Sequence, residues 1–152
     1  MLTGRLVLGL CLALVGATAV ACSPHAPFAI RLNDSGAVEI IDTRCEKRAV
    51  DRIEVIAPDG EGLLDDRDPR LWRIDFESPS TARTYVVGEV PPGAEEVVEW
   101  REPEPGRRLY LEVAWDRITT GTGFSLEDLA EGKVRYHLKN MTHEEFLTAS
   151  RC

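Results

Sequence analysis

Residues 109–115, Leu109-Tyr110-Leu111-Glu112-Val113-Ala114-Trp115, give the clearest indication of the fold class of this chain. Leucine, valine or tryptophan occupies every second position, and the positions between them include a glutamate and a tyrosine. Successive side chains of a β-strand point to opposite faces of the sheet. The alternation therefore predicts a strand with one buried face and one face in water.

The same two-residue period recurs along the chain, between clusters of Gly, Pro, Asn and Asp that are typical of turns. It predicts eight strands, at Phe28–Leu32, Val38–Ile40, Ile53–Val55, Trp72–Phe76, Tyr85–Val87, Val98–Trp100, Leu109–Trp115 and Val134–Leu138. No segment of helical period is long enough to connect parallel strands, so the pattern favours antiparallel sheets. We expect a mainly β protein, an antiparallel β-sandwich of the immunoglobulin or fibronectin type, with a closed barrel as the alternative.

Two short helical segments interrupt the strands, and both are marked by their first residues. Thr142 with Glu145 forms a capping-box pattern, which predicts a C-terminal helix over His143–Ala149 that covers one open end of the sandwich. Ser125 with Asp128 predicts a second capped turn, which ends at Gly132.

The first 21 residues have the features of a secretory signal. A head whose only charge is Arg5 precedes a weakly polar or apolar run from Leu6 to Ala21, which is too short to span a bilayer comfortably. The run ends in Ala19-Val20-Ala21-Cys22. No later stretch of the sequence is comparably apolar.

This ending resembles the lipobox of bacterial lipoproteins, although Ala19 stands where that family usually has leucine. The resemblance implies cleavage before Cys22 and attachment of diacylglycerol to its sulfur, so that two or more acyl chains hold the protein at the outer face of the cell membrane. The alternative is an ordinary secretory signal that leaves Cys22 as a free thiol. The expected organisation is a signal at 1–21, a tether at 22–27 and one domain at 28–152.

The arginine content adds a broader resemblance. Fifteen arginines against three lysines suggest a GC-rich genome, and the chain looks like the small lipoproteins of high-GC Gram-positive bacteria. That resemblance implies a location and no activity.

The charge limits the partners that the domain is expected to bind. The formal net charge of −8 becomes −9 once Arg5 leaves with the signal. An acidic protein lacks the basic stripe that neutralises nucleic-acid phosphates, so we expect no nucleic-acid partner. The same charge argues against the domain lying on anionic headgroups, and we expect the acyl chains to supply the attachment.

The chain has four cysteines, and two of them are available for a disulfide once the signal and the lipid site are set aside. Cys11 belongs to the signal and Cys22 takes the lipid, so Cys45 and Cys152 are predicted to form a disulfide in an oxidising compartment. It would close a loop of about 107 residues, a constraint of ~4–5 kcal/mol in the chain-entropy model. The alternatives are two free thiols or a bond to another protein.

A search for chemistry finds no specific motif. His25, His137 and His143 share no metal-binding spacing, and there is no serine-nucleophile motif. Gly121-Thr122-Gly123 lacks the lysine of a phosphate loop and indicates a hairpin or bulge. Trp72, Trp100 and Trp115 fall on the apolar side of their strands, which favours core packing over a sugar platform.

Asp65, Asp66 and Asp68 form the densest carboxylate cluster and are weak candidates for a divalent cation, because their spacing does not match a calcium loop. We therefore predict no cofactor and no enzymatic activity. The expected role is a lipid-anchored binding or structural module with an envelope protein partner. The alternatives are a glycan- or cation-binding accessory domain and a carboxylate-dependent hydrolase, which needs two converging carboxylates.

Overall fold

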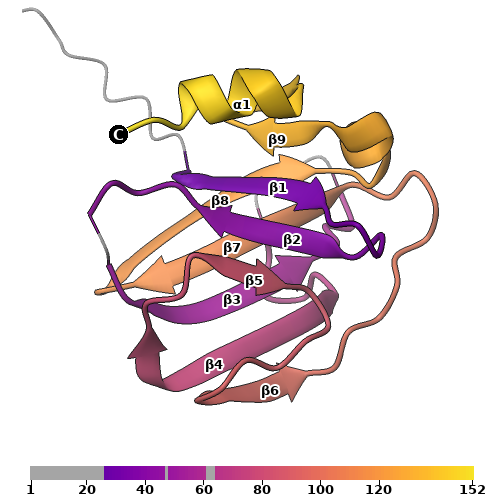
Figure 1. Cartoon of the computed structure of the whole chain (residues 1–152). Coiled ribbons are helices and arrows are strands. Elements are labelled where there is room, and N and C mark those ends of the chain that lie inside the picture. Colours follow the sequence, from indigo (N-terminus) through magenta and orange to yellow (C-terminus); the bar gives the residue numbers. More distant parts are fainter. Residues whose placement is uncertain (1–25, 47, 61–63) are drawn as a thin grey trace, which may run out of the picture.

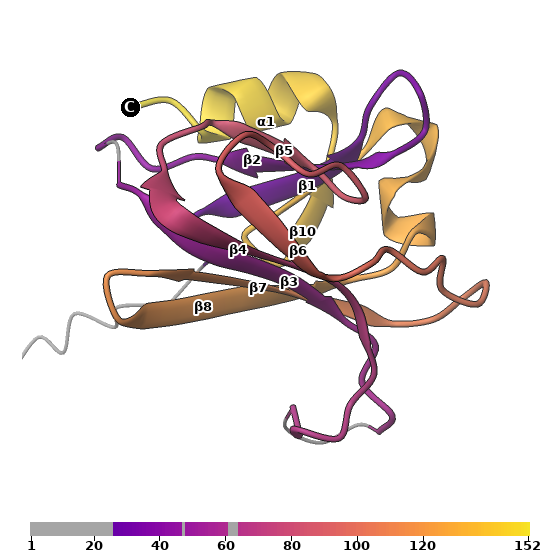
Figure 2. The same ribbon diagram turned by 90° about the horizontal axis from the view of Figure 1, so that it is seen from below.

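The computed structural model describes residues 26–46, 48–60 and 64–152 of the 152-residue chain. The expected signal, Cys22 and most of the tether lie outside the described residues. The described part forms ten strands in two antiparallel sheets that face each other, with one short helix near the C-terminus (Figures 1 and 2). The predicted β-sandwich is confirmed. It has more strands than an immunoglobulin domain, which has about seven to nine.

The first sheet has the order β10-β9-β1-β2-β5, and every neighbouring pair is antiparallel. Its strands in chain order are β1 (Phe28–Leu32), β2 (Val38–Asp42), β5 (Thr84–Val86), β9 (Val134–Tyr136) and β10 (Lys139–Met141). The second sheet has the order β6-β4-β3-β7-β8. Its strands are β3 (Val50–Ile56), β4 (Arg70–Ser80), β6 (Ala94–Val98), β7 (Leu109–Trp115) and β8 (Ile118–Phe124).

The core lies between the two sheets and is built by the alternation seen in the sequence. In β7 the apolar positions are all buried, and the positions between them are partly exposed. The inner faces bury large side chains completely, among them Trp72, Phe28, Ile30, Ile40, Ile53 and Leu111. Removal of this apolar surface from water is the main favourable term that holds one sheet on the other.

The predicted strand Val98–Trp100 is wrong, because β6 ends at Val98. Two further strands, β8 and β10, were not predicted from the sequence, and each follows a tight turn. β8 reads Ile-Thr-Thr-Gly-Thr-Gly-Phe, which has no apolar alternation, yet it pairs with β7 along its whole length. The two-residue turn Asp116-Arg117 joins them with φ values of 43° and 64°, the mirror-image turn that suits hairpins. Gly121 and Gly123 therefore belong to a hairpin strand.

The predicted strand over 134–138 is wrong in its second half. β9 ends at Tyr136, and the chain reverses at His137 and Leu138, which have φ values of 47° and 62°. β10 then returns along β9. Alternation alone did not reveal the turn, because His137-Leu138 lacks the Asn-Gly, Asp-Gly or Gly-Gly pair that usually marks such a hairpin turn.

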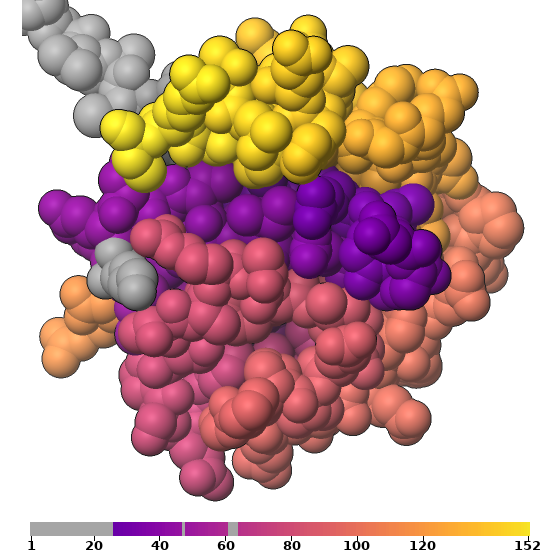
Figure 3. All heavy atoms as spheres, viewed as in Figure 1, coloured from indigo at the N-terminus to yellow at the C-terminus, as the bar shows by residue number. Residues whose placement is uncertain are grey.

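The helix α1 (His143–Ala149) has the predicted limits and the predicted capping box. The Glu145 N–H donates to the Thr142 hydroxyl at 3.2 Å, and the Thr142 N–H donates to the Glu145 carboxylate at 2.7 Å. The predicted position is wrong: α1 does not cover an open end. Its Phe146 packs with Ala29, Val134 and Tyr136 on the outer face of the first sheet. Figure 3 shows this yellow segment lying along the indigo strands.

The second predicted turn is the 3₁₀ helix η1 (Glu127–Gly132). Ser125 and Asp128 hold its start by two reciprocal hydrogen bonds of 2.9 and 3.2 Å. Across the described ranges, no helix is both long enough and apolar enough to cross a membrane.

The predicted disulfide joins Cys45 and Cys152, whose Cα atoms lie 5.4 Å apart. It ties the loop between β2 and β3 to the segment that follows α1. Beside it, Arg44 forms ion-paired hydrogen bonds with Asp42 and stacks on Trp115, with its guanidinium carbon 4.6 Å from the ring centre. A covalent bond and a cation–π contact therefore close the same corner.

Replacement of both cysteines by serine, Cys45→Ser with Cys152→Ser, is expected to lower the free energy of unfolding by about 4 kcal/mol. The reason is that the open chain of the unfolded state regains the freedom that a 107-residue separation had lost. Urea unfolding followed by tryptophan fluorescence measures it. Treatment of the unaltered protein with reductant should give the same shift, and an unchanged urea midpoint would contradict the expectation.

Candidate functional site

The outer face of the second sheet carries the most organised group of polar side chains in the described part of the chain. Its three central strands, β4, β3 and β7, place six charged residues there, which we call the charged face: Arg52, Glu54, Arg70, Arg73, Asp75 and Glu112. The register explains their proximity, since Glu54 lies opposite both Arg73 on β4 and Glu112 on β7. Three guanidinium groups therefore face three carboxylates.

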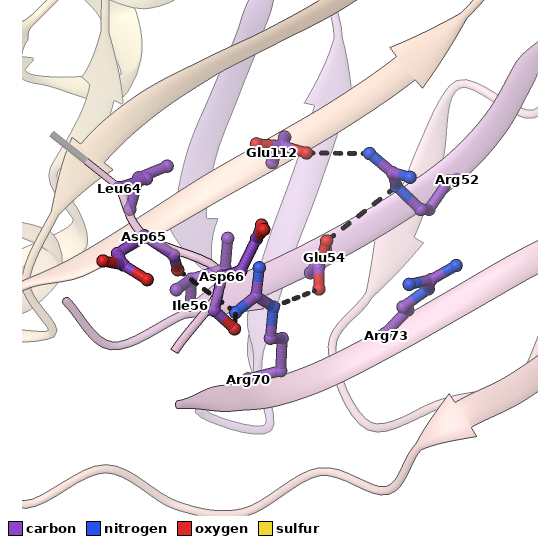
Figure 4. A pocket seen from close by; sticks show the side chains of 9 residues that line it. All are labelled: Arg52, Glu54, Ile56, Leu64, Asp65, Asp66, Arg70, Arg73 and Glu112. Atoms are coloured by element: carbon purple, nitrogen blue, oxygen red, sulfur yellow. Dashed lines mark hydrogen bonds and ion pairs between the residues drawn. The ribbon is translucent and has the colours of Figure 1, made fainter. Parts of the chain in front are cut away.

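Glu54 is at the centre of the charged face and is only 4% exposed. The Arg70 Nε donates to one carboxylate oxygen of Glu54 at 3.1 Å, and the Arg52 Nε lies 3.9 Å from the other. Arg52 also donates through Nη2 to Glu112 at 2.8 Å, so that one guanidinium connects two strands (Figure 4). Charged hydrogen bonds of this kind fix the side chains in place.

Arg73 and Asp75 form the second part of the charged face. They make two parallel hydrogen bonds, at 2.8 and 2.7 Å. The hydrogen bond from Arg73 lowers the pKa of the Asp75 carboxyl, and the same bond raises the pKa of Arg73. Both groups therefore stay charged over the whole physiological pH range.

A hollow of about 340 Å³ opens over the charged face. Leu64, Asp65 and Asp66, from the loop between β3 and β4, form its rim (Figure 4). Its size is that of a small-ligand site, but its lining is charged where such sites are mostly apolar. Groups on rigid strands with spare guanidinium N–H donors suit the polar groups of a partner.

The hydrolase alternative needs two converging carboxylates, and Glu54 and Glu112 do face the same hollow. Arginine side chains engage both of them. Both carboxylates are therefore paired with arginine in the structure.

The acidic loop is organised around its own backbone. The Asp68 carboxylate accepts the N–H of Asp59 at 3.0 Å and the N–H of Asp65 at 2.7 Å, and Asp68 is buried. The Arg70 Nη1 donates to the backbone carbonyls of Asp65, Asp66 and Asp68, at 3.3, 2.7 and 2.8 Å. The Arg70 guanidinium thus binds the carbonyl oxygens that a metal ion would use as ligands. In the ranges 26–46, 48–60 and 64–152, no three His, Cys, Asp or Glu side chains form a metal-binding group.

The aromatic candidates are structural. Trp72 and Trp115 are buried, and Trp100 lies beyond the end of β6, half-buried against Gly88. None of the three tryptophans is therefore an exposed platform. His137 was expected on the polar face of a strand, but it lies in the turn between β9 and β10, where its ring stacks on Tyr136 at 3.7 Å.

The sequence placed Arg52, Glu54, Arg73, Asp75 and Glu112 at the polar positions of the alternating pattern, but it did not single them out, and Arg70 lay outside the predicted strand Trp72–Phe76. Two facts were missing: the register that brings Arg52, Glu54 and Glu112 together, and the choice of the sheet that α1 covers. Arginine and glutamate at alternating positions, as in Arg52-Ile53-Glu54, were the only available signal.

Removal of one carboxylate tests the charged face. Glu54→Ala is expected to lower the free energy of unfolding by about 2 kcal/mol, because Arg70 loses a buried hydrogen-bond acceptor and Arg52 loses a partner of opposite charge. Glu131→Ala is the matched control, since Glu131 forms only a 3.6 Å exposed pair with Lys133 and should cost less than about 0.5 kcal/mol. Equal losses in urea unfolding would show that the charged face has no structural coupling.

The acidic loop gives a prediction about pH. Hydrogen bonds from the N–H groups of Asp65 and Asp59 lower the pKa of Asp68. A carboxyl with a depressed pKa stabilises the fold fully above its ordinary value of about 4, and this contribution is lost as the pH falls through the folded-state value. The stability difference between the unaltered protein and Asp68→Asn should therefore shrink as the pH drops below about 4. A difference that is constant down to pH 2 would contradict this.

The comparisons with known proteins give no family to which this chain can be assigned. No family model matches the chain, and no curated protein or solved structure matches it significantly. Its function has to be argued from the fold and the charged face.

Proposed function

We propose that this chain is a lipid-anchored, extracytoplasmic, non-enzymatic module of the bacterial cell envelope that binds a partner protein through the charged face. The observation that carries the proposal is the asymmetry of the sandwich. The helix α1 packs on the outer face of the first sheet, whereas no described helix covers the charged face.

The proposed location rests on two features. The sequence that ends in Ala21-Cys22 resembles a lipobox, and a Cys45–Cys152 disulfide is typical of proteins that fold in an oxidising compartment. The folded domain begins immediately after the expected tether, since β1 starts at Phe28. An anchor at Cys22 would therefore hold the domain close to the membrane.

The choice of a protein partner rests on the composition of the charged face and its neighbour Tyr110. Arginine and tyrosine are the residues that most often carry binding energy at protein interfaces. Tyr110 lies beside Ile56 in the register, half-buried, and its ring covers Gly121, where an added Cβ would lie 2.3 Å from the ring. Its position is fixed before any partner arrives, so little side-chain freedom is lost on binding.

The partner surface is tested by photo-cross-linking in intact cells. A photoreactive phenylalanine analogue at position 110 should give a discrete adduct with an envelope protein. The matched control places it at Leu147, an exposed residue on α1. The variant Arg73→Glu should remove the adduct while far-ultraviolet circular dichroism stays unchanged. Identical adducts from positions 110 and 147 would contradict the proposed surface.

The anchor is tested separately by cell fractionation. The unaltered protein should sediment with membranes and partition into detergent, because its acyl chains are buried in the bilayer. Cys22→Ala should appear in the soluble fraction. Membrane association that survives this substitution would show that Cys22 is not the anchor.

A further inference from the structure

The two ends of the sandwich differ in the charge of their loops. One end, which we call the proximal end, gathers the start of β1, the residues 43–46, 48–49 and 81–83, the turn 116–117 and the residues 150–152 at the left of Figure 1. The contacts agree with the view. The Thr43 N–H donates to the Pro27 carbonyl at 3.0 Å, Arg83 donates to the Arg44 carbonyl, and the disulfide brings residue 152 to residue 45.

The opposite, distal end gathers the described residues of four loops: 33–37, 57–60 with 64–69, 99–108 and 125–133. The Arg107 guanidinium pairs with Asp59, and the Gly106 N–H donates to Glu127 at 2.7 Å. A small hollow of about 150 Å³ brings Gly36, Trp100 and Leu126 together at this end. Four loops that are far apart in sequence thus form one surface.

The charge is divided unequally between these surfaces. The described residues of the four distal loops carry eleven acidic and five basic side chains. Those of the proximal loops carry two acidic and five basic side chains, but two further carboxylates adjoin them: Asp42 pairs with Arg44, and Asp51 accepts the N–H of Asp116. Four of the proximal arginines are exposed: Arg48, Arg83, Arg117 and Arg151. Among the described proximal residues, only two acidic side chains, Glu46 and Asp116, are exposed beside them, so the exposed part of the proximal end is basic. The net negative charge, which argued against contact with anionic headgroups, lies mainly at the distal end.

The expected lipid lies next to that basic end. Ala26 is buried and Pro27 is held by Thr43, so the fold fixes the chain from residue 26 onward. Only four peptide units separate Ala26 from Cys22. A fully extended chain covers at most about 3.6 Å per residue, so Cys22 lies within roughly 14 Å of Ala26.

We propose that the proximal end rests against the anionic phospholipid headgroups of the membrane that holds Cys22. This inference depends on the proposed acylation of Cys22. The short tether brings the proximal end to the surface, the exposed arginines are attracted by anionic headgroups, and the acidic distal loops are repelled by them. In this orientation the strands run from the membrane surface toward the distal loops.

This orientation also serves the proposed partner site. A seven-residue strand such as β7 spans roughly 23 Å, so the distal loops lie well beyond the headgroup layer. The charged face runs along the side of the upright domain and stays open to a protein that approaches parallel to the membrane.

The test measures energy transfer from two positions to an acceptor on the headgroups. The full chain is purified with its lipid, its acylation at Cys22 is verified by mass, and it is placed in vesicles of phosphatidylglycerol and phosphatidylcholine. A dye is attached through an unnatural amino acid at Ile118, an exposed proximal residue, or at Ser35 in the distal turn between β1 and β2. Transfer should be several-fold stronger from position 118.

Charge variants separate headgroup attraction from the tether. Replacement of Arg48, Arg117 and Arg151 by glutamine should reduce the transfer from position 118, as should 1 M salt or pure phosphatidylcholine. The matched control replaces three distal cations, Arg67, Arg108 and Lys133, by glutamine and should leave the transfer unchanged. Equal transfer from both dye positions, or equal effects of the two triple variants, would overturn the orientation. Absence of acyl groups from Cys22 would instead overturn the proposed function and the orientation that rests on it.

Discussion

Each of the two sheets has one apolar face, and the packing of these two faces against each other organises the whole domain. Trp72, Phe28 and Leu111 are buried only because the strands that carry them face each other across the core. Once the inner faces are used, the outer faces, the edge strands and the loop ends remain for other interactions. α1 packs on one outer face, and arginine–carboxylate pairs satisfy the polar groups of the other.

The charged face shows how a sheet can keep many charges close together without a helix above it. Glu54 is buried, but Arg52 and Arg70 bring opposite charge to its two oxygens, and Arg73 pairs with its own neighbour, Asp75. Such pairs contribute little to stability on balance, because each charge gives up water. Their main effect is to hold the guanidinium groups in fixed positions. Some of the guanidinium N–H donors then remain available to a partner.

Much of the fold, and little of the site, was predictable from the sequence. Alternation revealed β7 and most of the core, and the capping box of Thr142 and Glu145 revealed α1, because both are local sequence patterns. The disulfide followed from the number of cysteines that remained to be paired. β8 was missed because a strand of threonine and glycine is specified by its neighbour β7. The charged face was missed because it depends on register, which brings together residues about 60 positions apart, such as Arg52 and Glu112.

The two ends of the sandwich differ in charge, and its two outer faces differ in what covers them. These differences can orient the domain relative to the membrane only if the chain is anchored at residue 22. The most direct measurement is the intact mass of the protein released from native membranes, with and without reductant. We expect a chain that begins at Cys22, carries diacylglycerol with any further acyl chain, and gains two hydrogens on reduction of the Cys45–Cys152 bond. A chain that begins at Met1, or an unmodified Cys22, would contradict this expectation.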